Sequence, residues 1–246
     1  MVQRLVLWDI DGTLLRAGVA GAEIFDRAVE EALGRPLDPA VAVAMSGKTD
    51  PQIVREYLHL LGEPETDDTI LAVLRRLEQG LAAIAGELTT TGRVCPGVVD
   101  VLARLDADGR VVNSVLTGNI APNAVIKLRA FDLDRWLDLS VGAFGSDHHQ
   151  RNELVPIAIG RLAEERGTRV EPADVWVIGD TPLDLACARA AGARCLLVAT
   201  GRTGVDELGA LGADAVLADL TDTDGVVKLL TGDLDPGPSS ARHGAG

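Results

Sequence analysis

Short apolar runs alternate along the chain with longer segments of helical periodicity. Residues 5–8 form one such run, which is typical of a strand buried on both faces of a parallel sheet. Strand and helix alternate repeatedly, and this order predicts an α/β fold with a doubly wound parallel sheet. Strands are predicted at 5–8, 111–116, 175–178, 195–198 and 215–217, and helices at 97–108, 119–130, 154–166 and 183–191.

One segment breaks this alternation. Between the first and second strands, the pattern predicts helices at 22–33, 51–61 and 67–84, with no buried strand among them. An all-helical insertion explains this order, with glycine-rich hinges at both of its ends. We therefore expect a discontinuous catalytic core (1–17 and 93–231), a helical cap domain (18–92) and a disordered Gly/Pro/Ser-rich tail (232–246).

Composition narrows the possible partners and location. The formal net charge of −14 disfavours nucleic acid and anionic membranes as partners. The first residues are too short an apolar stretch for a signal peptide, and no later segment has the length of a membrane span. The three cysteines show no CxxC spacing, which favours reduced thiols in a cytoplasmic protein.

Two acids follow the first predicted strand, in the sequence Asp9-Ile10-Asp11-Gly12-Thr13. Acids two residues apart at a strand end face the same side, and placing them there is costly unless a function uses them. A hard cation such as Mg²⁺ would offset their repulsion. One carboxylate could attack phosphorus and the other could exchange protons with the leaving group and water. Alternatively, both acids could simply cap the turn.

Two further polar motifs follow predicted strands. Thr117-Gly118-Asn119 offers a hydroxyl and backbone N–H groups that could hold an anion, although Thr117 or Asn119 could equally be a helix cap. Asp180 and Asp184, in Gly179-Asp180-Thr181-Pro182-Leu183-Asp184, could bind a metal or could cap a helix. The carboxyl ends of parallel strands meet at one edge of the sheet, so the three motifs together predict a phosphoryl-transfer site.

These three motifs resemble the first, second and fourth motifs of the haloacid dehalogenase superfamily, in its phosphatase branch. The resemblance spans nearly the whole chain and implies a Rossmann-like core, a helical cap and Mg²⁺ as cofactor. It also implies that Asp9 is the nucleophile, and that Asp11 is the general acid/base. The remaining roles implied are phosphate binding by Thr117, Gly118 and Asn119, and metal binding by Asp180 together with Asp9 and the Asp11 carbonyl, with Asp184 supporting the site.

The third motif of that family departs from its usual form. The family usually has a lysine before the helix that follows the third strand, whereas this chain has Arg151 there, ahead of the predicted helix. An arginine can carry the charge and bind phosphate in a bidentate manner. We therefore predict catalytic and phosphate-binding roles for Arg151, with Lys127 as the alternative. Lys48, in the predicted cap, is a further candidate for contact with the substrate.

The resemblance implies hydrolysis of a small phosphorylated metabolite, as in phosphoglycolate phosphatases. A sugar phosphomutase of the same superfamily and a catalytically silent binding protein remain alternatives. A dehalogenase is disfavoured because, by resemblance, those enzymes lack an acid at the position of Asp11. A monomer or a homodimer is expected.

Overall fold

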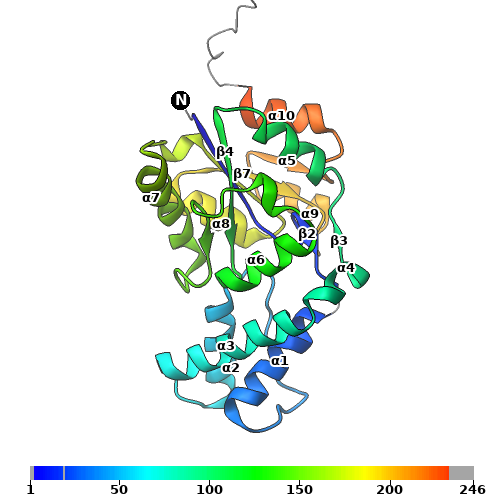
Figure 1. Ribbon diagram of the computed structural model, residues 1–246, viewed down its shortest axis with the longest axis vertical. Coiled ribbons are helices and arrows are strands. Elements are labelled where there is room, and N and C mark those ends of the chain that lie inside the picture. Colours follow the sequence, from blue (N-terminus) through cyan, green and yellow to red (C-terminus); the bar gives the residue numbers. More distant parts are fainter. Residues whose placement is uncertain (1–2, 19, 233–246) are drawn as a thin grey trace, which may run out of the picture.

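A six-stranded parallel sheet forms the centre of the molecule (Figure 1). The computed structural model describes residues 3–18 and 20–232. The strand order is β5-β4-β1-β6-β7-β8, so the first strand of the chain lies inside the sheet. The strands are β1 (Arg4–Trp8), β4 (Val111–Thr117), β5 (Ala143–Phe144), β6 (Val175–Gly179), β7 (Arg194–Val198) and β8 (Ala215–Leu217).

Helices cover both faces of this sheet, which explains the continuous apolar strands. Leu5 and Leu7 of β1 pack on one face, and Val6 and Trp8 on the other, as the two-residue period of a strand requires. One face is covered by α5 (Val98–Asp106), α6 (Ala121–Ala130) and α10 (Thr223–Thr231), and the other by α7 (Leu154–Arg166), α8 (Pro182–Ala191) and α9 (Val205–Gly209).

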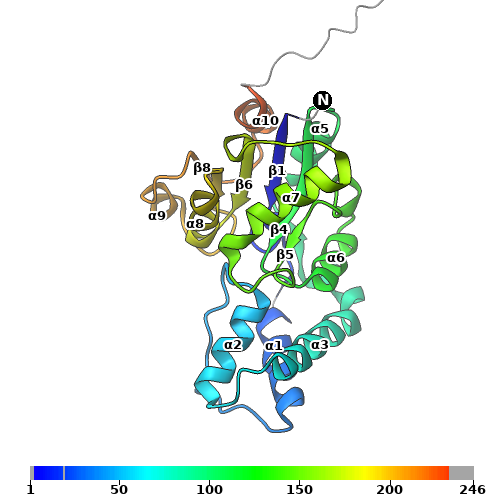
Figure 2. The ribbon, with the colours of Figure 1, turned by 90° about the vertical axis from the view of Figure 1, so that its left-hand side faces the viewer.

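Three helices form a separate layer beyond the carboxyl edge of the sheet (Figures 1 and 2). They are α1 (Ala20–Leu33), α2 (Asp50–Leu61) and α3 (Asp67–Ala83), and they pack around an apolar core of their own that includes Phe25, Val54 and Leu77. We call these helices and the segments that join them the helical unit. Two short strands, β2 (Leu15–Arg16) and β3 (Arg93–Val94), pair antiparallel where the chain enters and leaves it.

Capping residues explain where the helices that face the sheet edge begin. Thr49 caps α2 by accepting a hydrogen bond from the Gln52 N–H, and Pro51 occupies its first turn. Thr181 and Asp184 form a capping box at the start of α8. The short helices are α4 (Leu88–Thr91) and the 3-10 turns η1 (Ala85–Glu87), η2 (Asp134–Trp136), η3 (Arg151–Glu153) and η4 (Pro172–Asp174).

The predicted fold class is confirmed. All five predicted strands and every predicted helix are present, with ends that differ by a few residues. Strand β5 was not predicted, because two residues carry no usable periodicity. Helix α6 begins at Ala121 instead of Asn119, since Asn119 belongs to the turn that follows β4. The predicted tail lies outside the described residues, except for Gly232.

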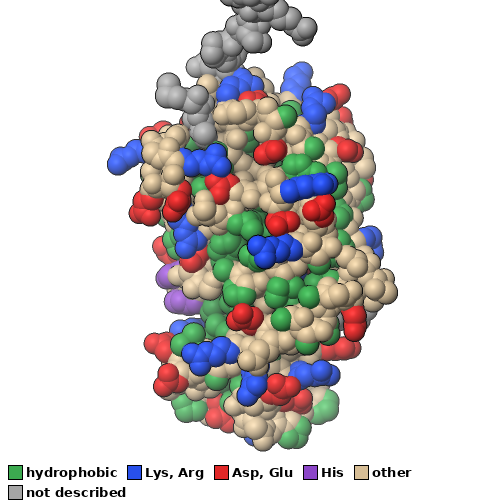
Figure 3. All heavy atoms as spheres, viewed as in Figure 1, with side chains coloured by type: hydrophobic (Ala, Val, Ile, Leu, Met, Phe, Trp, Pro, Cys, Tyr) green, Lys and Arg blue, Asp and Glu red, His purple; other side chains and the backbone are tan. Residues whose placement is uncertain are grey.

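Side chains of both charges lie on the surface. On the face shown in Figure 3, acidic and basic side chains are interspersed, and hydrophobic side chains gather mainly across the middle. Among the helices of the described ranges, none combines the length and the apolar character that crossing a bilayer requires.

Candidate active site

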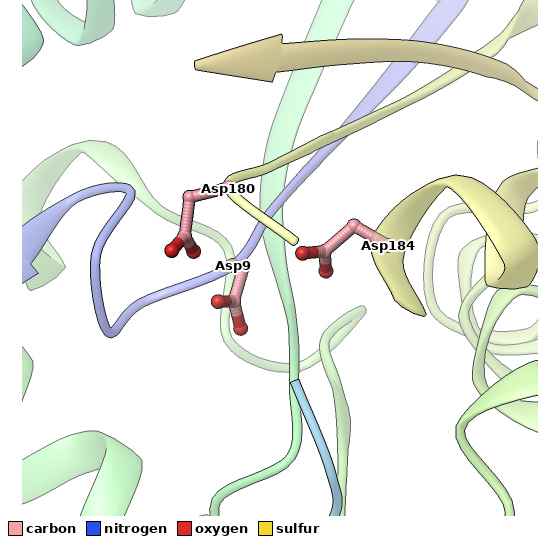
Figure 4. A group of neighbouring side chains, drawn as sticks. All are labelled: Asp9, Asp180 and Asp184. Atoms are coloured by element: carbon pink, nitrogen blue, oxygen red, sulfur yellow. The ribbon is translucent and has the colours of Figure 1, made fainter. Parts of the chain in front are cut away.

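Three aspartates from separate segments meet at the carboxyl edge of the sheet. Asp9 follows β1, Asp180 follows β6, and Asp184 lies in the first turn of α8 (Figure 4). All three are buried, and one carboxylate oxygen of each lies within 4.8 Å of the others. The strand order explains this arrangement, because β1 and β6 are neighbours and both end at the same edge.

Burial raises the pKa of two of these aspartates to near neutral pH. Loss of solvation raises the pKa of Asp9 to about 7, with Arg151 opposing the shift and Asp184 adding to it. Burial, together with the neighbouring Asp9 and Asp184 carboxylates, likewise raises the pKa of Asp180 to about 8. If all three aspartates were ionised, they would carry more negative charge than Arg151 alone neutralises.

The Asp180 carboxylate fits its position because two neighbouring residues are glycines, which have no side chain. A Cβ atom at Gly201 would overlap Asp180 Oδ2, and one at Gly12 would also collide with this carboxylate. Gly12 has a φ of 92°, which glycine adopts without strain. The Thr13 hydroxyl completes the setting by donating to Asp180 Oδ1 at 3.2 Å. The Asp180 carboxylate is thus held in one narrow position.

Arg151 is the cation of this cluster. Its Nη2 atom lies 2.9 Å from Asp9 Oδ1 and 2.5 Å from Asp184 Oδ1. Burial alone would lower the pKa of Arg151, but the carboxylates of Asp184 and Asp9 outweigh this effect and raise it, so the guanidinium stays charged. Its position in η3, directly before α7, brings it to the nucleophile candidate. Arg151 therefore neutralises part of the charge on Asp9.

Asp184 has its own hydrogen-bond partners. Its Oδ2 accepts from the backbone N–H of Thr181 at 3.0 Å and from the Thr181 hydroxyl at 2.7 Å, while Oδ1 faces Arg151. Both oxygens are thus engaged with the protein. This geometry suits a residue that orients Arg151 and the start of α8.

A second group of polar side chains lies beside the cluster. The Asp11 carboxylate faces Asn119 and Lys127, and it is not part of the three-carboxylate group found in the described ranges. Asn119 Nδ2 donates to Asp11 Oδ2 and to Thr117 Oγ1, both at 2.8 Å. Lys127 Nζ donates to Asp11 Oδ2 at 2.6 Å and to Asn119 Oδ1 at 2.7 Å. Acid, amide, hydroxyl and ammonium are therefore joined in one network.

Lys48 takes a different position from the other candidates. Its Nζ pairs with Glu56 Oε2 of α2 at 2.5 Å, and no contact with the three aspartates is found for it within the described residues. Its backbone carbonyl instead lies against Gly118, where a Cβ atom would have no room. The segment around Lys48 thus touches the turn after β4 through its main chain.

The structure brings most of the predicted site residues together. The exception is the side chain of Lys48, and Asp11 joins the site through Lys127 and Asn119. The sequence interpretation gave no role to Thr13, Gly201 or Asp50. Gly201 could have been considered, because it follows a predicted strand at the same edge as the acids. Asp50 offered no such signal, since its contacts depend on how the helical unit meets the sheet.

The acidic cluster fits a hard divalent cation. Its donors are carboxylate oxygens, which Mg²⁺ prefers, and they already lie within reach of a single ion. The raised pKa values of Asp9 and Asp180 indicate that a positive charge is needed before both ionise at neutral pH. Close packing against Gly12 and Gly201 also restricts the positions that the Asp180 carboxylate can take.

Comparisons with known proteins show what this chain resembles. Residues 6–189 match a family model described as haloacid dehalogenase-like hydrolase. A plasmid-encoded phosphoglycolate phosphatase of Cupriavidus necator is 31% identical over 87% of this chain and 89% of its own length. A phosphoglycolate phosphatase of Rhodospirillum rubrum is 28% identical over 89% of this chain and 90% of its own length.

The fold comparison agrees as well. The crystal structure of a haloacid dehalogenase-type hydrolase from Entamoeba histolytica has a TM-score of 0.68 at 19% identity, covering 93% of this chain and 99% of that one. A protein from Bacteroides vulgatus, provisionally named β-phosphoglucomutase, has a TM-score of 0.67 at 19% identity, with coverage of 96% and 91%. At such identities the likeness concerns the fold alone.

Proposed function

Because this chain belongs to the haloacid dehalogenase-like hydrolase family, we propose that it hydrolyses a small phosphate monoester with the Asp9 carboxylate as nucleophile. The family match and the phosphatase relatives confirm the predicted resemblance and the predicted class of enzyme, a phosphatase hydrolase. The substrate, the metal and the roles of individual residues belong to our proposal.

The observation that carries the proposal is the setting of Asp9. This carboxylate is buried at the end of a central strand, with Arg151 on one oxygen and Asp180 beside it. A buried carboxylate with a raised pKa is poised for chemistry, and a cation beside it favours its ionised, nucleophilic form. Arg151 also offers a positive charge to the phosphoryl oxygens.

We assign the metal site to Mg²⁺, held by the carboxylates of Asp9 and Asp180 and by the backbone carbonyl of Asp11. When bound, the ion would neutralise the phosphoryl oxygens and keep Asp9 ionised. Asp184 supports the site by orienting Arg151 and Thr181.

The reaction then needs two steps. An oxygen of Asp9 attacks phosphorus, the ester P–O bond breaks, and the leaving oxygen takes a proton from Asp11. Asp11 next removes a proton from water, which attacks the aspartyl-phosphate and releases inorganic phosphate while Asp9 is regenerated. Thr117, Gly118 and Asn119 hold phosphoryl oxygens through a hydroxyl, backbone N–H groups and an amide.

The helical unit would serve as the cap that excludes water and selects the substrate, in a domain spanning residues 18–92 between the two parts of the core (1–17 and 93–231). Lys48 could meet an anionic group of the substrate after exchanging its partner Glu56. The two phosphoglycolate phosphatase relatives make a small phosphorylated carboxylic acid the first substrate to test. All three cysteines are free and buried, which supports a cytoplasmic location.

The alternatives have less support. A sugar phosphomutase would use the same acids, but it is suggested only by structural neighbours whose low identity concerns the fold. A catalytically silent protein would not need a buried cation beside Asp9. This chain has one, because Arg151 pairs with Asp9.

The decisive experiment is trapping of the phosphoryl-enzyme. The purified protein should hydrolyse p-nitrophenyl phosphate with Mg²⁺ and lose this activity in EDTA. Mass spectrometry after rapid acid quench should find phosphate on the peptide that contains Asp9. Asp9→Asn should reduce kcat by about 10³-fold or more while the protein stays folded. Full turnover by Asp9→Asn would refute the assignment, and a hexose 1-phosphate converted to its 6-phosphate would favour the mutase.

A further inference from the structure

One segment of the helical unit is built into the candidate active site. Residues 47–50 precede and open α2, which lies next to the core (Figure 2). They contact the loops that follow three strands of the sheet. A Cβ atom at Gly47 would collide with the hydroxyl of Thr181, which follows β6. A Cβ atom at Gly118, which follows β4, would overlap the Lys48 carbonyl. Thr49, fully buried, donates its hydroxyl to the His149 carbonyl at 2.5 Å, in the loop after β5.

Asp50 makes the most specific of these contacts. Its backbone N–H donates to the Gly118 carbonyl at 2.7 Å, and its Oδ2 accepts from the Ile120 N–H at 2.8 Å. Gly118 and Ile120 flank Asn119, which binds Asp11 and Thr117. Asp50 thus spans both sides of Asn119, and the residue is only 6% exposed.

We propose that Asp50 is a positioning residue that holds the phosphate-binding turn 117–120 in its working shape, so that the turn is ordered only while the helical unit is seated on the core. The inference rests on the proposed function for the identity of this turn. It gives the helical unit a role beyond covering the site, because one of its own side chains completes the binding geometry.

The charges around Asp50 suit such a contact. Burial raises its pKa to about 7; the Ile120 N–H and Lys127 on α6 oppose this shift, and Asp11 after β1 adds to it. The buried Ile120 N–H requires a hydrogen-bond acceptor, and this acceptor need not be charged. An asparagine should therefore replace Asp50 with little loss, whereas an alanine leaves a buried N–H without a partner.

The experiment compares Asp50→Ala and Asp50→Asn, with Asp26→Ala as the matched control. Asp26 accepts the Tyr57 hydroxyl at 2.6 Å within the helical unit, so its loss weakens the unit without touching the turn. Calorimetric titration with inorganic phosphate in the presence of Mg²⁺ measures binding, and p-nitrophenyl phosphate gives kcat and KM. Hydrogen exchange of peptides covering residues 117–121 reports the order of the turn.

Asp50→Ala should weaken phosphate binding and raise KM by about fivefold or more, and it should speed exchange at residues 117–121. Asp50→Asn and Asp26→Ala should stay within about twofold of the unchanged protein in both respects. Unchanged exchange and phosphate affinity in Asp50→Ala would overturn the inference, as would an equal effect of Asp26→Ala. If the unchanged protein neither binds nor hydrolyses phosphate esters, the proposed function fails, while the exchange comparison still decides the role of Asp50.

Discussion

Lys127 and Asp11 are 116 positions apart in the chain, yet the Lys127 ammonium donates a hydrogen bond of 2.6 Å to the Asp11 carboxylate. Arg151 makes the corresponding contact with Asp9 at 2.9 Å. The sequence presented these two cations as alternatives for one place, whereas the structure gives each its own acid. The nucleophile candidate and the acid/base candidate are therefore held by different partners.

Replacement of Lys127 tests its role at Asp11. Lys127→Ala removes the group that orients the Asp11 and Asn119 side chains, so kcat/KM for p-nitrophenyl phosphate should fall by about 10- to 100-fold. Lys127→Arg should restore part of this loss. Arg129→Ala is the control, because Arg129 lies on the same helix but is exposed and pairs with Asp134. Equal activity in Lys127→Ala and Arg129→Ala would show that the contact has no part in turnover.

Replacement of Arg151 should cost more. Arg151→Ala leaves Asp9 and Asp184 without their buried cation, which should lower the free energy of unfolding by roughly 3–5 kcal/mol and reduce activity further than Lys127→Ala does. Arg151→Lys keeps the charge and should be milder in both respects.

Chemical denaturation and steady-state kinetics measure these two effects of Arg151 separately. Arg161→Ala is the matched control, since Arg161 of α7 pairs with Asp147, and among the described residues it contacts neither Asp9 nor Asp184. A greater loss of activity in Lys127→Ala than in Arg151→Ala would reverse the proposed assignment of the third motif.

A single methyl group should disturb the metal site. Gly201→Ala places a Cβ atom on Asp180 Oδ2, so this carboxylate must move; we expect a destabilisation of about 1–3 kcal/mol and about tenfold or greater loss of Mg²⁺ affinity. Gly209→Ala is the control, because nothing lies within 4 Å of its added Cβ. Magnesium titrations followed by thermal shift compare the two variants. Equal affinities would contradict the packing argument.

The sequence could predict what depends on strand ends. Asp9 and Asp180 each follow an apolar strand, and parallel strands bring their carboxyl ends to one edge, so their meeting was foreseeable. The partners of Lys127 and Asp50 were not, because they depend on where α6 begins and on how the helical unit sits. Lys48 was a candidate for contact with the substrate, and the motif did not show that Glu56, eight positions later, lies within reach of its ammonium. Such short-range competition is not visible in a motif.

The stability of the metal-free protein should fall as pH rises from about 5 to about 8.5. Asp9 and Asp180 have folded-state pKa values of about 7 and about 8, above their ordinary value of 3.8, so the folded state binds protons more tightly than the unfolded chain. Stability is then greatest at low pH within this interval, and it is lost as each group ionises. Asp50, with a pKa of about 7, acts in the same direction.

Bound Mg²⁺ should reverse this trend, because the ion competes with protons for the same carboxylates. The gain in Tm on adding saturating magnesium chloride to EDTA-treated protein should therefore be larger at about pH 8.5 than at about pH 6. Asp180→Asn should flatten the metal-free profile in part and abolish most of the gain, while Asp206→Asn, an exposed residue of α9, should change neither. A metal-free Tm that rises across this interval, or a magnesium gain that survives in Asp180→Asn, would show that these carboxylates do not form the metal site.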